Sequence, residues 1–239
     1  MAAKKKILVL SANAGFGHRS AAMALVAAAE SARASECDVV LANPLDCEKT
    51  PAWLREVQSD YDRLARDMPQ LYKLGYDLSD KNVVSKFVEN ALGVLLFRSL
   101  RQALRSHEPD VVVSTYPLYQ APLGLAFAME GRAVPLVCVV TDLATVHQIW
   151  FSRESDLTIV PTVRVRDLAL EAGLEPGRVE VIGIPVHPRI SAEARPREEL
   201  RRSLGWDPRL ATVLAVGSKR VGRLPEALRL FIASMEESA

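Results

Sequence analysis

The chain has 239 residues, 49% of them hydrophobic, which is enough for one large domain and part of another. Its formal net charge of +1 gives no reason to expect nucleic acid or another polyanion as a partner. No apolar run approaches the ~20 residues of a membrane span. The three cysteines, Cys37, Cys47 and Cys138, lack metal-ligand spacing and suit a reducing compartment. We therefore expect a protein that is soluble or bound to a membrane surface.

Six short apolar runs, each suited to a buried strand, alternate with helical segments. The runs are residues 7–11, 37–41, 111–115, 136–140, 157–160 and 179–182. Helices are predicted over residues 18–34, 82–106, 121–130 and 163–172, and a further one begins at Pro51. Uniformly apolar strands separated by helices are typical of a parallel sheet covered on both faces. The expected fold class is α/β, with a doubly wound Rossmann-like sheet.

The helix predicted over residues 82–106 carries a long apolar stripe that includes Leu96, Leu100 and Leu104. Such a stripe is most simply a face packed in the core. The alternative is a face that touches a bilayer, because Phe97 lies beside Arg98 and two further arginines follow. We favour the core.

The last quarter of the chain changes character. Residues 191–210 are rich in proline and charge and predict a linker, with a helix over residues 197–204. A strand is predicted over residues 212–217, then a glycine turn and a helix over residues 224–234. One strand and one helix bury no core of their own. We therefore expect one domain over residues 1–190 and the incomplete start of a second Rossmann-like domain over residues 211–239.

The turn after the first strand is the first candidate site. Its sequence runs Asn13-Ala14-Gly15-Phe16-Gly17-His18 and leads directly into an alanine-rich helix. Backbone N–H groups at such a helix N-terminus favour anions, and histidine transfers protons near neutral pH. A dinucleotide fingerprint is not indicated, because Ser20 occupies the third glycine position and no acid follows the second strand.

The stretch from Thr141 to Phe151 is the second candidate site. It follows a predicted strand and carries a hydroxyl, the Asp142 carboxylate, the His147 imidazole and aromatic rings. The alternative is that Asp142 caps a helix and His147 is a solvated loop residue. Spacing alone leaves both interpretations open. Two other strand ends carry turn residues, Thr115-Tyr116-Pro117 and Gly183-Ile184-Pro185-Val186. In a parallel sheet all of these lie at the edge where ligands bind.

These motifs occur together in the order found in one family. The chain resembles the N-terminal half of processive diacylglycerol glycosyltransferases and plant-type monogalactosyldiacylglycerol synthases. The residues that carry the resemblance are 10–18 with Ala21 and Ala22, 110–115, 140–147 with Trp150 and Phe151, and 183–186. That family is in turn similar to the glucosaminyltransferase that completes lipid II.

The resemblance implies a two-domain GT-B fold whose N-terminal domain holds a lipid acceptor and touches the membrane. A C-terminal domain holds the UDP-sugar, and the hexose moves with inversion, without a cofactor or metal. By resemblance His18 is the general base, and Gly15 and Gly17 form the loop beneath the reacting groups. The residues expected on the acceptor side are Asn13, Tyr116, Pro117, Thr141, Asp142 and His147. The residues expected on the donor side or hinge are Gly183, Pro185, Val186 and Gly217.

The expected partners are a lipid acceptor, an anionic membrane surface and a nucleotide-sugar, with the protein peripheral on the cytoplasmic face of the membrane. Lys219 and Arg220 stand where the family usually has glycines, and they either contact donor phosphate or mark a different donor. The residues that would hold UDP-sugar lie beyond Ala239. A non-catalytic lipid- or anion-binding module, or one subunit of a split glycosyltransferase, is therefore the alternative. A nucleotide-sugar epimerase is a weaker one.

Overall fold

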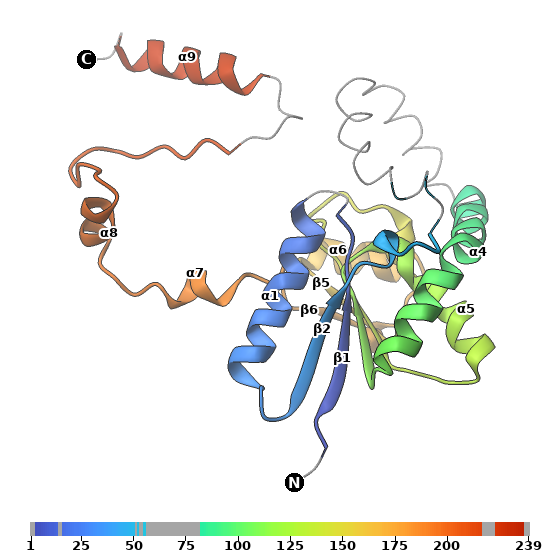
Figure 1. The fold of residues 1–239 in the computed structure, drawn as a ribbon. Coiled ribbons are helices and arrows are strands. Elements are labelled where there is room, and N and C mark those ends of the chain that lie inside the picture. The colour runs from blue at the N-terminus through green and yellow to red at the C-terminus, as the bar shows by residue number, and fades with distance from the viewer. Residues whose placement is uncertain are drawn as a thin grey trace.

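In a computed structural model, six parallel strands form one sheet with helices packed against it (Figure 1). The structure describes residues 3–13, 16–50, 52, 55, 82–216 and 223–236, and describes no side chains for residues 82–93 and 236. The strands are β1 (Lys5–Leu10), β2 (Cys37–Ala42), β3 (Val111–Ser114), β4 (Leu136–Val139), β5 (Leu157–Val160) and β6 (Val179–Val181). Every predicted strand before residue 190 is present to within two residues at each end, so the predicted α/β class is confirmed.

The helices also follow the sequence pattern. They are α1 (Phe16–Ala32), α4 (Asn82–His107), α5 (Gln120–Glu130), α6 (Val163–Glu171), α7 (Pro188–Ala192), α8 (Arg197–Ser203) and α9 (Leu224–Glu236). Four short 3-10 helices join them: η1 (Pro44–Asp46), η2 (Pro117–Tyr119), η3 (Gln148–Trp150) and η4 (Pro176–Arg178). The helix predicted from Pro51 falls largely outside the described residues.

The strand order β2-β1-β3-β4-β5-β6 reverses direction at β1. Ile7 of β1 pairs with Val39 of β2 on one side and with Val111 of β3 on the other. After β1 the chain forms β2 on one side of it, and β3 later pairs with the other side of β1. Helix α1 covers one face of the sheet, while α4 and α5 cover the opposite face (Figure 1). The carboxyl ends of β1 and β3 therefore form the topological switch point, where doubly wound sheets bind their ligands.

The main core lies between the sheet and α4. Leu96 and Leu100 are fully buried and Leu104 nearly so, in one cluster with Leu8, Val112 and Leu136 of the sheet. The predicted core role of this stripe is confirmed for these three leucines. Val94 on the same helix is 72% exposed. A second cluster packs α6 against β4, β5 and β6.

Helices lie on both faces of the sheet, as predicted, but the burial of individual strands differs. β3 and β5 alternate between half-buried and buried residues, so in the described part of the chain one of their faces is only partly covered. Val40 and Leu41 of β2 are 40% and 39% exposed. β2 has a strand on one side only, which leaves its residues less enclosed than those of the central strands.

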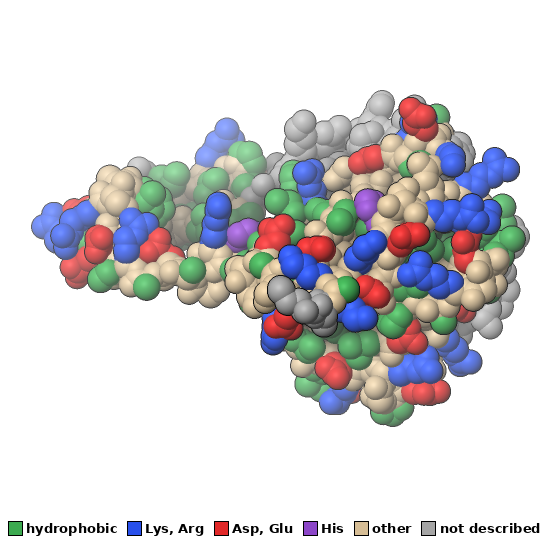
Figure 2. Space-filling model, turned by 60° about the horizontal axis from the view of Figure 1, so that its bottom comes forward, with side chains coloured by type: hydrophobic (Ala, Val, Ile, Leu, Met, Phe, Trp, Pro, Cys, Tyr) green, Lys and Arg blue, Asp and Glu red, His purple; other side chains and the backbone are tan. Residues whose placement is uncertain are grey.

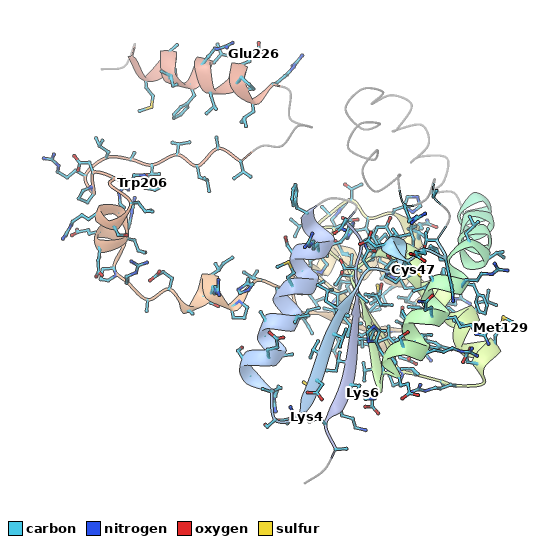
Figure 3. The ribbon with its side chains drawn as sticks, viewed as in Figure 1. Lys4, Lys6, Cys47, Met129, Trp206 and Glu226 are labelled. Atoms are coloured by element: carbon cyan, nitrogen blue, oxygen red, sulfur yellow. The ribbon has the colours of Figure 1, made fainter. Side chains whose placement is uncertain are left out.

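The prediction of a strand over residues 212–217 is wrong as far as the structure describes it, over residues 212–216. They have no regular secondary structure, and Leu214 and Val216 are 82% and 78% exposed. An apolar run becomes a strand only beside another strand, and none is placed there within the described residues. Figure 3 shows the described residues that follow Trp206, as far as residue 216, running apart from the sheet. The division into a first domain, a linker and a second domain stays a prediction.

Charge is spread evenly over the face shown in Figure 2, where acidic and basic side chains are interspersed. This distribution agrees with the formal net charge of +1.

Candidate functional site

His18 lies at the switch point of the sheet. It is the third residue of α1, and the segment that precedes α1 comes from the carboxyl end of β1. The hydroxyl of Thr115, just after β3, donates to the carbonyl oxygen of His18 over 3.0 Å. The backbone N–H of Thr115 donates to the Leu10 carbonyl oxygen over 3.0 Å. The first turn of α1 is thus tied to the ends of both central strands.

The imidazole of His18 is enclosed by residues from two other strand ends. Its Nδ1 lies 3.1 Å from Oγ1 of Thr141, which follows β4. The Tyr116 ring meets it edge-on at a centroid distance of 5.2 Å, and the Trp150 ring lies tilted at 5.7 Å. The side chain remains partly exposed. The structure therefore brings together three predicted site residues, His18, Tyr116 and Thr141, from loops far apart in sequence.

Asp142 holds one wall of this enclosure. Its Oδ2 accepts a hydrogen bond of 2.8 Å from the indole Nε1 of Trp150, whose side chain is 1% exposed. A buried indole N–H needs an acceptor, and a carboxylate is a strong one. Asp142 is therefore not the helix cap that one sequence interpretation allowed. Its carboxylate also lies close enough to His18 to favour the imidazolium.

Burial lowers the pKa of His18 below the ordinary histidine value of 6.5. Removing water from around the imidazole destabilises the charged form, and this effect outweighs the Asp142 carboxylate and the Thr115 backbone, which both raise the pKa. At neutral pH the side chain is therefore neutral and able to accept a proton. A base held neutral in this way is suited to deprotonating a hydroxyl.

Asn13 lies beside the turn and is tied to its surroundings. Its amide Nδ2 lies 3.4 Å from Oδ2 of Asp46, and its Oδ1 lies 3.4 Å from Nη1 of Arg19. Below this turn, the buried hydroxyl of Tyr119 donates to Oδ1 of Asn43 over 3.1 Å. These contacts link the loop after β1 to η1 and η2.

The glycines of the predicted site differ from one another. A Cβ at Gly17 would meet no protein atom within 4 Å, so packing does not require glycine there. Gly183 has a φ of +116°, a conformation that side chains rarely adopt, so glycine is needed for the turn after β6. Gly15 and Gly217 lie outside the described residues.

The other predicted residues lie at the same edge of the sheet with different local roles. Nδ1 of His147 accepts from the backbone N–H of Ile149 over 3.1 Å and so caps η3. Pro117 opens η2, where the missing N–H of proline costs nothing. Pro185 and Val186 follow β6 in a loop, and Val186 is 60% exposed.

Two residues of the site were not among those predicted for it. Thr115 and Trp150 belong to the strand ends that the sequence singled out, but their contacts with His18 and Asp142 depend on long-range packing. Within the described residues no group of three His, Cys, Asp or Glu side chains is arranged to hold a metal ion.

A groove of about 750 Å³ lies along α4. Its lining includes four basic side chains, Lys49, Arg98, Arg101 and Arg105. Figure 3 labels Cys47, whose thiol lies 3.5 Å from Oε1 of Gln102 and brings the loop that carries Lys49 against α4. Arg101 and Arg105 share Glu130 of α5, and together they lower the pKa of that carboxyl. Lys49 and Arg98 have no carboxylate partner in the described part of the chain, so the groove is positively charged.

A family model described as monogalactosyldiacylglycerol (MGDG) synthase matches residues 18–186, which is more than half of the chain and includes the whole enclosure around His18. The chain belongs to the MGDG synthase family. The predicted resemblance is thereby confirmed.

Curated relatives agree with this assignment. The chain is 32% identical over 218 residues to the chloroplastic MGDG synthase of Spinacia oleracea, covering 89% of this chain and 41% of that protein. It is 31% identical over 215 residues to MGDG synthase 1 of Arabidopsis thaliana, covering 89% of this chain and 40% of that protein. The chain thus spans about two-fifths of the length of these two MGDG synthases.

Among solved structures, the chain is similar to HepE of Anabaena in complex with UDP-glucose, with a TM-score of 0.44 and 16% identity over 84% of this chain and 50% of that one. It is also similar to the lipopolysaccharide galactosyltransferase WaaB, with a TM-score of 0.46 and 13% identity over 75% of this chain and 45% of that one. The family assignment rests on the sequence matches. In the described part of the chain, no helix combines the length and the apolar character that a membrane crossing requires.

Proposed function

We propose that this MGDG synthase family member supplies the acceptor-binding half of an inverting glycosyltransferase, which moves a hexose from a UDP-sugar to diacylglycerol or a related lipid. The observation that carries the proposal is the neutral, enclosed imidazole of His18 at the switch point of the sheet. An inverting transfer needs a base beside the attacking hydroxyl, and a neutral imidazole can serve as that base.

In the proposed mechanism, the residues at the carboxyl edge of the sheet have different roles. The acceptor hydroxyl lies beside His18, which takes its proton as the oxygen attacks the anomeric carbon. The N-terminus of α1, where backbone N–H groups carry partial positive charge, helps to stabilise the departing diphosphate. Asn13, Gly15, Gly17, Tyr116, Pro117, Thr141, Asp142 and His147 form the acceptor side. Gly183, Pro185, Val186 and Gly217 form the hinge and donor side.

The decisive experiment is a panel of UDP-sugars and acceptors, assayed with liposomes on a full-length form of the protein. Transfer to diacylglycerol in liposomes supports the proposal. Transfer only to soluble acceptors would remove the lipid assignment, and failure with every UDP-sugar would remove the donor assignment.

Gly17 provides a test that separates function from folding. Gly17→Ala should leave the stability unchanged or raise it by up to about 1 kcal/mol, because alanine is preferred to glycine in helices and the methyl group meets no protein atom. In the proposed mechanism the acceptor occupies the open space at this turn of α1, so the added methyl group should lower kcat/KM. Thermal unfolding and steady-state kinetics measure the two effects. Gly177→Ala in η4, whose added methyl group is equally unopposed, is the control and should leave kcat/KM unchanged.

A second part of the proposal is that the protein works at an anionic membrane surface, on its cytoplasmic face. The basic groove along α4 supports this, because cations near a bilayer attract anionic headgroups. Leu96, Leu100 and Leu104 of α4 are buried in the core, so we propose that this attachment is electrostatic and weakens with salt.

Lys49 and Arg98 are the two groove cations without a carboxylate partner among the described residues, and removing both should weaken membrane binding. At about 1 kcal/mol for each cation, Lys49→Gln/Arg98→Gln is expected to bind vesicles of mixed neutral and anionic lipid about thirtyfold more weakly. Vesicle sedimentation measures the affinity. Arg33→Gln/Arg178→Gln carries the same change in charge on exposed residues elsewhere and should bind as the wild type does. Equal weakening of both double variants would show that only net charge matters and would exclude the groove.

A further inference from the structure

The hydroxyl of Thr141 lies against one particular nitrogen of His18. Oγ1 and Nδ1 are 3.1 Å apart. A hydroxyl can donate or accept, so the distance fits either neutral tautomer of the imidazole. The tautomers differ in chemistry: only the one with its proton on Nδ1 leaves a lone pair on Nε2 for a substrate proton.

Nδ1 is the ring nitrogen that faces Thr141, so Nε2 is the nitrogen left to face an acceptor hydroxyl. The proposed function requires a lone pair on Nε2, and a neutral imidazole with that lone pair carries its proton on Nδ1. With the proton there, the hydroxyl of Thr141 is the acceptor in the 3.1 Å contact.

Thr141 is itself held in place on both sides. The backbone N–H of Val140 donates to the Ile159 carbonyl oxygen over 2.9 Å and continues the pairing of β4 with β5 by one residue. Asp142 is anchored through its 2.8 Å hydrogen bond with buried Trp150. A hydroxyl between two anchored residues keeps its position and can therefore fix the orientation of a neighbouring ring.

We propose that Thr141 is a positioning residue, whose Oγ1 accepts the Nδ1–H of His18 and holds the neutral imidazole in the tautomer that presents Nε2 to the acceptor. This rests on the proposed function. The acceptor hydroxyl gives its proton to Nε2, its oxygen forms a bond to the anomeric carbon of the UDP-sugar, and the bond from that carbon to the diphosphate oxygen breaks. UDP leaves with the electron pair, and the imidazolium keeps its Nδ1–H on Thr141.

The tautomer is measured directly in the wild-type protein. Labelling the four histidines with 15N and recording long-range 1H–15N correlations above the pKa of His18 shows which ring nitrogen is protonated. His18→Gln identifies the His18 signals. The expected result is protonated Nδ1 and unprotonated Nε2. Protonated Nε2 in the wild type would overturn the proposal, whatever the protein transfers.

Variants of Thr141 test whether the hydroxyl is the cause. Thr141→Val keeps the shape and removes the hydroxyl, and it should shift His18 toward a mixture of tautomers. Thr141→Ser keeps the hydroxyl and should preserve the wild-type spectrum. An unchanged tautomer in a folded Thr141→Val variant would overturn the proposal, and dispersed amide signals show that the variant is folded.

Kinetics separate positioning from direct contact with the acceptor. Thr141→Val should lower kcat by about ten- to a hundredfold, as removal of a group that orients a functional histidine typically does, with the acceptor KM unchanged. Thr141→Ser should restore kcat. A raised acceptor KM with unchanged kcat would instead make Thr141 a binding residue. If no transfer is detected at all, the proposed function fails, while the spectrum still reports the tautomer.

Discussion

Replacing His18 with alanine is expected to lower kcat/KM for the lipid acceptor by about 10²–10⁴-fold, the usual contribution of a general base. The affinity for UDP-sugar should stay near that of the wild type, because this part of the chain binds the acceptor in the proposed mechanism. Steady-state kinetics and calorimetric titration with UDP measure the two quantities. Wild-type turnover by His18→Ala would remove His18 from the mechanism.

The pH profile tests the same assignment without a substitution. Burial lowers the pKa of His18, so the base loses its function only when the pH falls below the ordinary histidine value of 6.5. The acidic limb of kcat/KM should therefore lie below pH 6.5. A limb above that value would point to another base. His107→Gln is the control, because it removes another imidazole, at the C-terminal end of α4 and outside the candidate site.

Leu100→Ala should destabilise the protein by about 2–5 kcal/mol, because it removes a large side chain from a packed core and leaves a cavity. Leu100 is fully buried where α4 packs against the sheet and α5. Chemical denaturation measures the change in the free energy of unfolding. The expected loss is a large part of the stability of an ordinary domain.

Val94→Ala is the control on the same helix, because Val94 is 72% exposed. It should change the free energy of unfolding by about 0.5 kcal/mol or less. Similar small effects of both substitutions would mean that α4 is not packed as the structure shows. The apolar stripe would then be free to touch a bilayer.

The sequence was sufficient to predict the strands because a parallel sheet buries its strands on both sides, and that leaves short uniformly apolar runs. The same signal misled at residues 212–216. Their apolar run is as clear as that of β6, yet a strand depends on its neighbours as well as on its own residues. An apolar run indicates that a segment is favoured to be buried, but it does not indicate whether a neighbouring strand is present to pair with it.

The contacts within the candidate site show a similar limit. Topology alone placed His18, Thr115 and Thr141 at one edge of the sheet, since all three follow parallel strands. It did not indicate that Thr141 meets Nδ1 or that the carboxylate of Asp142 serves Trp150. These contacts depend on how the side chains are oriented, which the topology does not determine. The spacing of His147 in the sequence likewise did not predict that its imidazole caps η3.

The pairing of Ile7 with Val111 joins residues 104 positions apart, at the switch point of the sheet. The entropy of closing a long connection grows only with the logarithm of its length, at about 0.6 kcal/mol for each doubling. Residues added between β2 and α4 are therefore expected to cost the fold little, whereas residues added between Asp142 and η3 would separate Asp142 from Trp150 and break their hydrogen bond. We expect the first connection to tolerate insertions that the second does not.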